Sequence, residues 1–90
     1  MKYDFISDAS HGWLKAPVSL VKELGIADKI TLYSYISEDG KTAYLEEDSD
    51  GCKFAKAIEA RGEKFEYEEK YCDGRSYVRS LPPFTLERCR

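Results

Sequence analysis

The most informative segment of this chain is Lys29–Gly62, which reads KITLYSYISEDGKTAYLEEDSDGCKFAKAIEARG. Its first half holds two alternating stretches, Lys29–Ser37 and Thr42–Glu47, on either side of Asp39 and Gly40. An Asp-Gly pair between alternating stretches is typical of a β-hairpin with a two-residue turn, in which both turn residues need positive φ. We therefore predict a β-hairpin in this segment.

The predicted hairpin has two different faces, because alternate residues of a strand point to opposite sides. A shift of one residue would exchange the faces. We expect the aliphatic face to enter the core, and the tyrosine face is a candidate contact surface. The predicted register pairs Ser34–Leu45, Tyr35–Tyr44 and Ile36–Ala43. The aliphatic face carries Leu32, Ser34, Ile36, Ala43 and Leu45, and the tyrosine face carries Tyr33, Tyr35, Thr42, Tyr44 and Glu46.

A helix is predicted to follow the hairpin and to run to about Arg61. We expect its N-cap at Asp48, Ser49 or Asp50, because short polar side chains accept hydrogen bonds from the free N–H groups of a first turn. Gly62 is expected to end it. The predicted buried stripe consists of Cys52, Phe54, Ala55, Ala57 and Ile58.

The rest of the chain predicts a second hairpin, a short helix and two further strands. In chain order these are strands at Lys2–Ser7 and His11–Ala16, a helix that starts at Pro17 and ends before Gly25, an edge strand at Glu63–Cys72, a turn at Cys72–Gly74 and a last strand at Ser76–Leu81. The sequence therefore predicts one α+β domain over residues 1–90, with a small, mostly antiparallel sheet of four to five strands, two helices and an irregular tail at 85–90.

The composition is that of a folded, moderately acidic protein, since 42% of its 90 residues are hydrophobic and the formal net charge is −3. Twelve acidic and six basic residues lie between Glu38 and Asp73. Nucleic-acid binding needs a basic face, so this balance makes nucleic acid an unlikely partner. No apolar run reaches the length of a membrane span, and the N-terminus has no signal-peptide pattern. We therefore expect a cytoplasmic protein without membrane contact.

Two blocks of the sequence resemble a family of short proteins found on phages, plasmids and proteobacterial chromosomes. The first block is HGWLKAP at His11–Pro17 with LGIADKI at Leu24–Ile30, and the second is YSY followed by AYLEEDSD at Ala43–Asp50. The resemblance covers roughly residues 3–60. It carries no assigned chemistry. What it implies is a context, because accessory proteins of mobile elements often act by binding host machinery.

The tyrosine face is the first candidate binding surface. Tyrosine joins a large apolar ring to a hydrogen-bonding hydroxyl and is enriched at protein interfaces. Alternatively, a helix or the Pro82–Phe84 segment covers this face and makes the tyrosines part of the core. An exposed face would bind a foreign protein or form a homodimer, and nearby acids would steer a basic partner. The candidate partner-binding residues are Tyr33, Tyr35, Tyr44, Glu46, Glu47 and Asp48.

The acidic run Glu46–Gly51 also suggests a metal site, because Asp48, Asp50 and Glu59 stand at positions 1, 3 and 12 of an EF-hand loop. The match fails, since Cys52 occupies position 5, where the loop needs an oxygen ligand. A helix start explains the run, because carboxylates there complement the helix dipole. We therefore expect no metal and no cofactor.

The cysteines do not indicate a disulfide framework, because their number is odd and no C-x-x-C pair occurs. Reduced thiols suit the cytoplasm. A small enzyme would use one of these thiols or His11, the only histidine. Zinc binding by the same set lacks the usual ligand spacing. The three cysteines are Cys52, Cys72 and Cys89.

A nucleic-acid-associated protein is a second alternative, because the C-terminal segment carries Arg75, Arg79, Arg88 and Arg90 against Glu87. The function we expect is different. We expect a non-catalytic protein-binding module, an accessory protein of a mobile element that occludes or modulates a host protein.

Overall fold

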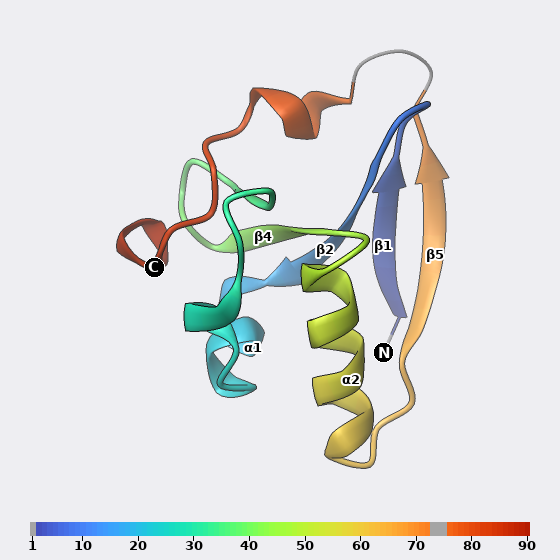
Figure 1. Ribbon diagram of the computed structural model, residues 1–90, viewed down its shortest axis with the longest axis vertical. Helices are drawn as coiled ribbons and strands as arrows, with labels where there is room; N and C mark the ends of the chain where they lie inside the picture. Colours follow the sequence, from blue (N-terminus) through green and yellow to red (C-terminus); the bar gives the residue numbers. More distant parts are fainter. Residues whose placement is uncertain (1, 73–75) are drawn as a thin grey trace.

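The computed structural model describes residues 2–72 and 76–90, and it contains one sheet and two α-helices (Figure 1). The predicted turn after Cys72 lies outside the described residues. The strands are β1 (Lys2–Ser7), β2 (Gly12–Pro17), β3 (Tyr35–Ile36), β4 (Thr42–Glu46) and β5 (Glu66–Tyr71), and the α-helices are α1 (Val18–Glu23) and α2 (Asp50–Ala60). Short 3-10 helices are η1 (Ala27–Lys29), η2 (Tyr77–Ser80) and η3 (Leu86–Arg88).

The strands form one sheet in the order β3-β4-β2-β1-β5, which confirms the predicted α+β fold. The predicted N-terminal hairpin is present as β1 and β2. The pairs β2–β4 and β3–β4 are also antiparallel, as expected, but β5 runs parallel to β1, so the sheet is mixed. Parallel strands need a crossover connection, and α2 supplies it by carrying the chain from β4 across the sheet to β5.

The predicted register of the β3–β4 hairpin is confirmed by the pairs Tyr35–Tyr44 and Ile36–Ala43. The turn differs from the prediction. The Gly40 N–H donates to the Ser37 carbonyl at 2.9 Å, and within the turn only Gly40 has a positive φ, of 73°. The Asp39 carboxylate accepts from the Ser37 hydroxyl at 2.5 Å and from the Lys41 N–H at 3.0 Å. A hydrogen-bonded side chain therefore shapes the turn, and Asp39 needs no left-handed backbone.

Strand β3 is shorter than predicted, because the chain before Ser34 leaves the sheet. The Ser34 N–H donates to the Thr31 carbonyl at 3.3 Å, which closes a turn at Leu32 and Tyr33. Leu32 is 69% exposed, so its predicted place on the core face is wrong. The rest of that face is buried as predicted, namely Ser34, Ile36, Ala43 and Leu45.

The two helices cover one face of the sheet and enclose the main core. Each helix ends as predicted at a left-handed glycine, α1 at Gly25 and α2 at Gly62. Pro17 belongs to β2 and precedes α1, so it is not the first helical residue as predicted. The main core consists of Tyr3, Leu14, Ala16, Val18, Val21, Ile26, Ile36, Ala43, Leu45, Phe54, Ile58 and Phe84.

The buried stripe of α2 is narrower than predicted. Phe54 and Ile58 are buried in the main core, while Ala55 and Ala57 are only half-buried. Cys52 is exposed, which corrects its predicted burial. The reason is that Asp50 and Gly51 take the buried positions of the first turn, so the stripe starts on a different side of the helix.

The opposite face of the sheet holds a second cluster, which consists of Ile6, Trp13, Tyr44 and Val78. Val78 comes from η2, where we predicted a strand at Ser76–Leu81, and that prediction is wrong. The Ser76 hydroxyl accepts the Val78 N–H at 3.3 Å and starts the 3-10 turn instead. The C-terminal chain therefore covers the tyrosine face of the hairpin in part, which is one of the two alternatives left open by the sequence.

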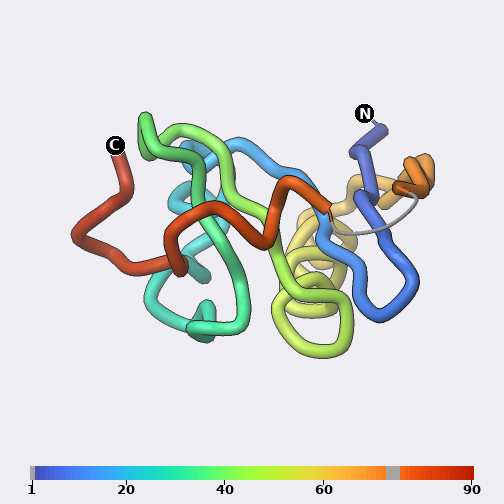
Figure 2. Tube along the Cα trace, turned by 90° about the horizontal axis from the view of Figure 1, so that it is seen from above, coloured from blue at the N-terminus to red at the C-terminus, as the bar shows by residue number. Residues whose placement is uncertain are grey.

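The chain after η2 runs alongside β3, as Figure 2 shows for the orange and red trace beside the green one. The Ile36 N–H donates to the Pro82 carbonyl at 3.0 Å, and the Phe84 N–H donates to the Ser34 carbonyl at 2.9 Å. Phe84 thereby reaches the main core. Residues 85–90, predicted to be an irregular tail, contain η3 and end with a hydrogen bond of 2.9 Å from the Arg90 N–H to the Gly40 carbonyl.

Candidate functional site

An open groove of about 360 Å³ lies beside the second cluster. Its lining comes from β2, β3, β4, η2 and the loops around residues 11, 32 and 48, so it exists only when these distant segments pack together. We call it the aromatic–acidic groove, and its lining residues are His11, Trp13, Leu32, Tyr33, Tyr35, Glu46, Asp48 and Arg79.

One side of the groove is an aromatic wall formed by the rings of Trp13, Tyr35 and His11. Trp13 lies at its centre and is only 2% exposed. The Tyr35 ring stands edge-on to it with 5.9 Å between centroids, and the His11 ring lies 6.2 Å away. The Arg79 guanidinium lies over the indole, 5.2 Å from the ring centroid. This wall therefore already accommodates one cation on an electron-rich face.

The buried carboxylate of Asp8 holds Arg79 against Trp13. Arg79 donates to both carboxylate oxygens, at 2.7 and 3.1 Å. The same carboxylate accepts the N–H groups of Ser10 and His11, both at 3.0 Å. The Arg79 guanidinium, aided by these N–H groups, holds the pKa of Asp8 well below its usual range. The pair therefore joins the β1–β2 turn to η2 and fixes one wall of the groove.

Acid is expected to weaken this pair. The folded pKa of Asp8 lies below that of an unfolded aspartate, about 3.9. Its contribution to stability is therefore complete above that pH and is lost as the pH falls through the folded pKa. We expect Arg79→Gln to lower the urea midpoint of unfolding at pH 7, and the two midpoints to converge as the pH falls. Urea titrations across the acid range test this, with exposed Arg88→Gln as the control, and a difference that does not vary with pH would contradict it.

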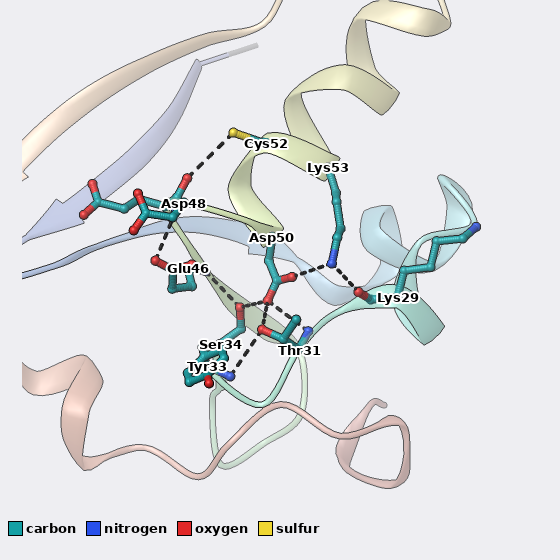
Figure 3. Close-up of polar contacts among 10 residues, drawn as sticks. Lys29, Thr31, Tyr33, Ser34, Glu46, Asp48, Asp50, Cys52 and Lys53 are labelled. Atoms are coloured by element: carbon teal, nitrogen blue, oxygen red, sulfur yellow. Dashed lines mark hydrogen bonds and ion pairs between the residues drawn. The ribbon is translucent and has the colours of Figure 1, made fainter.

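Asp50, in the first turn of α2, holds the loop that carries Tyr33 (Figure 3). Its Oδ2 accepts the Ser34 hydroxyl at 2.5 Å, the Thr31 hydroxyl at 2.7 Å and the Thr31 N–H at 3.0 Å. Its Oδ1 lies 3.0 Å from the Lys53 ammonium. The Ser34 hydroxyl in turn accepts the Glu46 N–H at 2.8 Å, so one network joins α2, the loop and β4.

This network keeps Asp50 ionised although the side chain is buried. Burial by itself raises the pKa of Asp50, but the hydrogen bonds from Ser34, Thr31 and Lys53 outweigh it and lower the pKa below its usual value. The N-cap of α2 lies at Ser49, one of the three predicted positions, but the predicted side-chain cap is not formed. The Asp50 carboxylate turns to the loop instead of the helix.

The structure brings four of the six predicted site residues together in the groove, which are Tyr33, Tyr35, Glu46 and Asp48. Tyr33 is 76% exposed. The Asp48 N–H donates to a Glu46 carboxylate oxygen at 3.0 Å, which keeps the two acids close.

Tyr44 lies apart from the groove and is only 6% exposed, so it is not part of an exposed surface as predicted. Tyr77 stands edge-on over it with 5.8 Å between ring centroids, and their hydroxyls are 3.5 Å apart. Burial and the Tyr77 hydroxyl raise the pKa of Tyr44. Tyr44 therefore packs between the sheet and the C-terminal chain, as part of the second cluster.

Glu47 faces a second, more apolar groove of about 300 Å³ beside the first turn of α2. Burial, with the charges of Asp48 and Glu46, raises the pKa of Glu47. The exposed Cys52 thiol also lines this groove and contacts the Glu47 carbonyl at 3.8 Å. His11 lines the aromatic–acidic groove, so His11 and the Cys52 thiol lie in different grooves.

The C-terminal arginines do not form one patch among the described residues, which leave Arg75 out. Arg79 pairs with Asp8, while Arg88 and Arg90 lie beside Gly40. Residues 2–72 and 76–90 also contain no group of three side chains suited to hold a metal ion. No helix in these residues is both long and apolar enough to span a membrane.

Sequence reasoning missed the framework of the groove. Asp8 and Arg79 are 71 residues apart in the chain, and no local pattern links them. The position of Trp13 in the wall of the groove could not be predicted either, because a tryptophan in this pattern indicates only packing in the core. No protein family, curated protein or solved structure matches this chain in the comparisons made.

Proposed function

We propose that this chain is a non-catalytic protein-binding module whose contact surface is the aromatic–acidic groove. The observation that carries the proposal is that exposed apolar side chains and two carboxylates line the same groove. Leu32 and Tyr33 are 69% and 76% exposed beside Glu46 and Asp48. Large apolar side chains at the surface are typical of interaction sites, and tyrosine is enriched at interface cores.

The chemistry of the groove favours a basic side chain from the partner. Carboxylates of Glu46 and Asp48 supply negative charge, and the aromatic rings supply electron-rich faces for a cation. A lysine or arginine between them would gain both interactions. The acids would also steer a basic partner during the encounter, so association is expected to slow as salt rises.

The groove is also preorganised for binding. The Asp50 network fixes the loop with Tyr33, and the Asp8–Arg79 pair fixes Trp13 and η2. A rigid contact surface loses little conformational entropy on binding, which raises affinity for a given set of contacts.

We further propose that the partner is a host protein and that binding occludes or modulates it. The resemblance to short proteins of phages and plasmids supports this context. The exposed Leu32 and Tyr33 at the mouth of the aromatic–acidic groove suit steric occupation of a partner's surface.

Capture of partners from host lysate on the immobilised chain tests the proposal. We expect the parent chain to retain a stoichiometric partner and Tyr33→Ser to weaken its binding by roughly 30-fold or more, the size of an interface hot spot. Tyr33 is exposed, so the variant is expected to keep its fold, which circular dichroism checks. Asp48→Asn is expected to reduce the salt sensitivity of binding.

Leu86→Ser is the control, because Leu86 is also a large exposed apolar residue but lies outside the groove. A partner that binds the parent, the control and Tyr33→Ser equally would refute the groove as the contact surface. A partner released by Tyr33→Ser alone would support it.

A further inference from the structure

The two edges of the sheet are treated differently by the rest of the chain. At one edge, the segment around Pro82 and Phe84 pairs with β3 and covers it. At the other edge, all six residues of β5 are exposed, and no described segment pairs with its outer side (Figure 1). Tyr67 and Tyr71 of β5 are 56% and 60% exposed. An open strand edge of this length is a template for pairing with another strand.

The direction of the free backbone groups follows from the pairing of β5 with β1. The Cys72 N–H donates to the Ser7 carbonyl at 2.7 Å, so the backbone groups of Cys72 point toward β1. Successive residues of a strand alternate in direction. The N–H and C=O groups of Tyr67, Glu69 and Tyr71 therefore point outward, to the open edge.

We propose that β5 pairs with β5 of a second copy, antiparallel, to form a dimer with one continuous sheet. The two-fold axis passes beside Glu69. In this register Tyr67 lies opposite Tyr71 of the second copy, and Glu69 lies opposite Glu69 of the second copy. The outward N–H and C=O groups of these three residues are then hydrogen-bonded in both copies. In an isologous contact of this kind, every pair away from the two-fold axis occurs twice, and the Glu69 pair on the axis occurs once.

The side chains of β5 are self-complementary in the same register. Glu68 faces Lys70 of the second copy, and the exposed Tyr67 and Tyr71 stack in pairs across the contact. Within one strand, the Lys70 ammonium lies 2.8 Å from a Glu68 carboxylate oxygen, so the two side chains extend on the same face of β5. Both are therefore placed to contact an opposite charge of the second copy on that face. Cross-strand aromatic pairs and opposite charges both stabilise antiparallel strands.

Glu69 is the only like-charge pair of this register, and β1 reduces its cost. The Ser7 hydroxyl donates to the Glu69 carboxylate at 2.7 Å, which draws the carboxylate toward β1 and away from the axis. In the alternative register with Glu68 on the axis, Tyr67 would face Glu69 and lose its aromatic partner. The contact is small, so we expect a dissociation constant in the micromolar range rather than a permanent dimer.

Charge reversal at β5 tests this dimer by sedimentation over a concentration series. Glu68→Lys and Lys70→Glu each place like charges opposite each other twice, so each is expected to weaken self-association by about tenfold or more. An equimolar mixture of the two variants restores two opposite-charge pairs and is expected to associate as tightly as the parent. Both positions are exposed and outside the core, so the variants are expected to fold.

Amide exchange measured by NMR gives an independent readout. The amides of Tyr67, Glu69 and Tyr71 are expected to become protected as the parent concentration rises, while that of Lys70, already directed at β1, is not. A parent chain that stays monomeric at roughly 1 mM, single variants that dimerise like the parent, or a mixture that stays monomeric would each overturn the proposal.

Discussion

Replacing Asp50 by alanine is expected to lower the free energy of unfolding by about 3–5 kcal/mol, because each buried donor left without its acceptor costs about 1–3 kcal/mol. The Asp50 side chain is fully buried and accepts from Ser34, Thr31 and Lys53. Its removal leaves the Ser34 hydroxyl and the Thr31 N–H without their acceptor. Urea unfolding followed by circular dichroism measures the loss.

Asp48→Ala is the matched control, because Asp48 lies two residues earlier and is exposed. Its effect is expected to stay within about 0.5 kcal/mol, as for ordinary surface positions. A loss at Asp50 no larger than that at Asp48 would show that the buried carboxylate is not needed. A double-mutant cycle with Ser34→Ala isolates the contribution of that hydrogen bond.

The pH dependence of the Asp50 effect has a defined sign. The folded pKa of Asp50 is lowered, so its contribution to stability is present above the unfolded pKa and is lost as the pH falls through the folded pKa. The difference between the parent chain and Asp50→Asn, which is never ionised, is therefore expected to shrink in acid. A difference that grows as the pH falls would contradict the network.

Replacing Phe84 by alanine is expected to destabilise the fold by about 3–5 kcal/mol, as for other large-to-small changes in a core. Phe84 is buried in the main core, although it lies only six residues from the C-terminus. The cavity would be left beneath the Pro82–Phe84 segment that pairs with β3. Thermal and urea unfolding measure the loss.

Leu86→Ala provides the comparison, because Leu86 is a large apolar residue on the same segment but is 56% exposed. Its effect is expected to stay below about 0.5 kcal/mol. Equal effects at Phe84 and Leu86 would mean that the C-terminal segment is not part of the core. Loss of groove binding in Phe84→Ala is also expected, because η2 and β3 would no longer be held together.

Several parts of the fold could be predicted because their signals are local. The alternation around Tyr35 and Tyr44 and the Asp-Gly turn set the register of the β3–β4 hairpin. Gly25 and Gly62 mark the helix ends, since only glycine adopts a left-handed ending at no cost. Four of the six candidate site residues lie in one groove because they belong to this hairpin and its flanks, which are close together in the sequence.

The parts that were missed depend on contacts between distant segments. The direction of β5, the burial of Tyr44 beneath Tyr77 and the Asp8–Arg79 pair all involve residues far apart in the chain. Asp50 reads as a helix cap because short polar residues favour that position. It became a buried acceptor only because tertiary packing placed Thr31, Ser34 and Lys53 around it. The sequence by itself thus determined the hairpin register and the helix ends, whose free energy comes from nearby residues, whereas the groove and its framework were decided by long-range packing, whose partners no local pattern identifies.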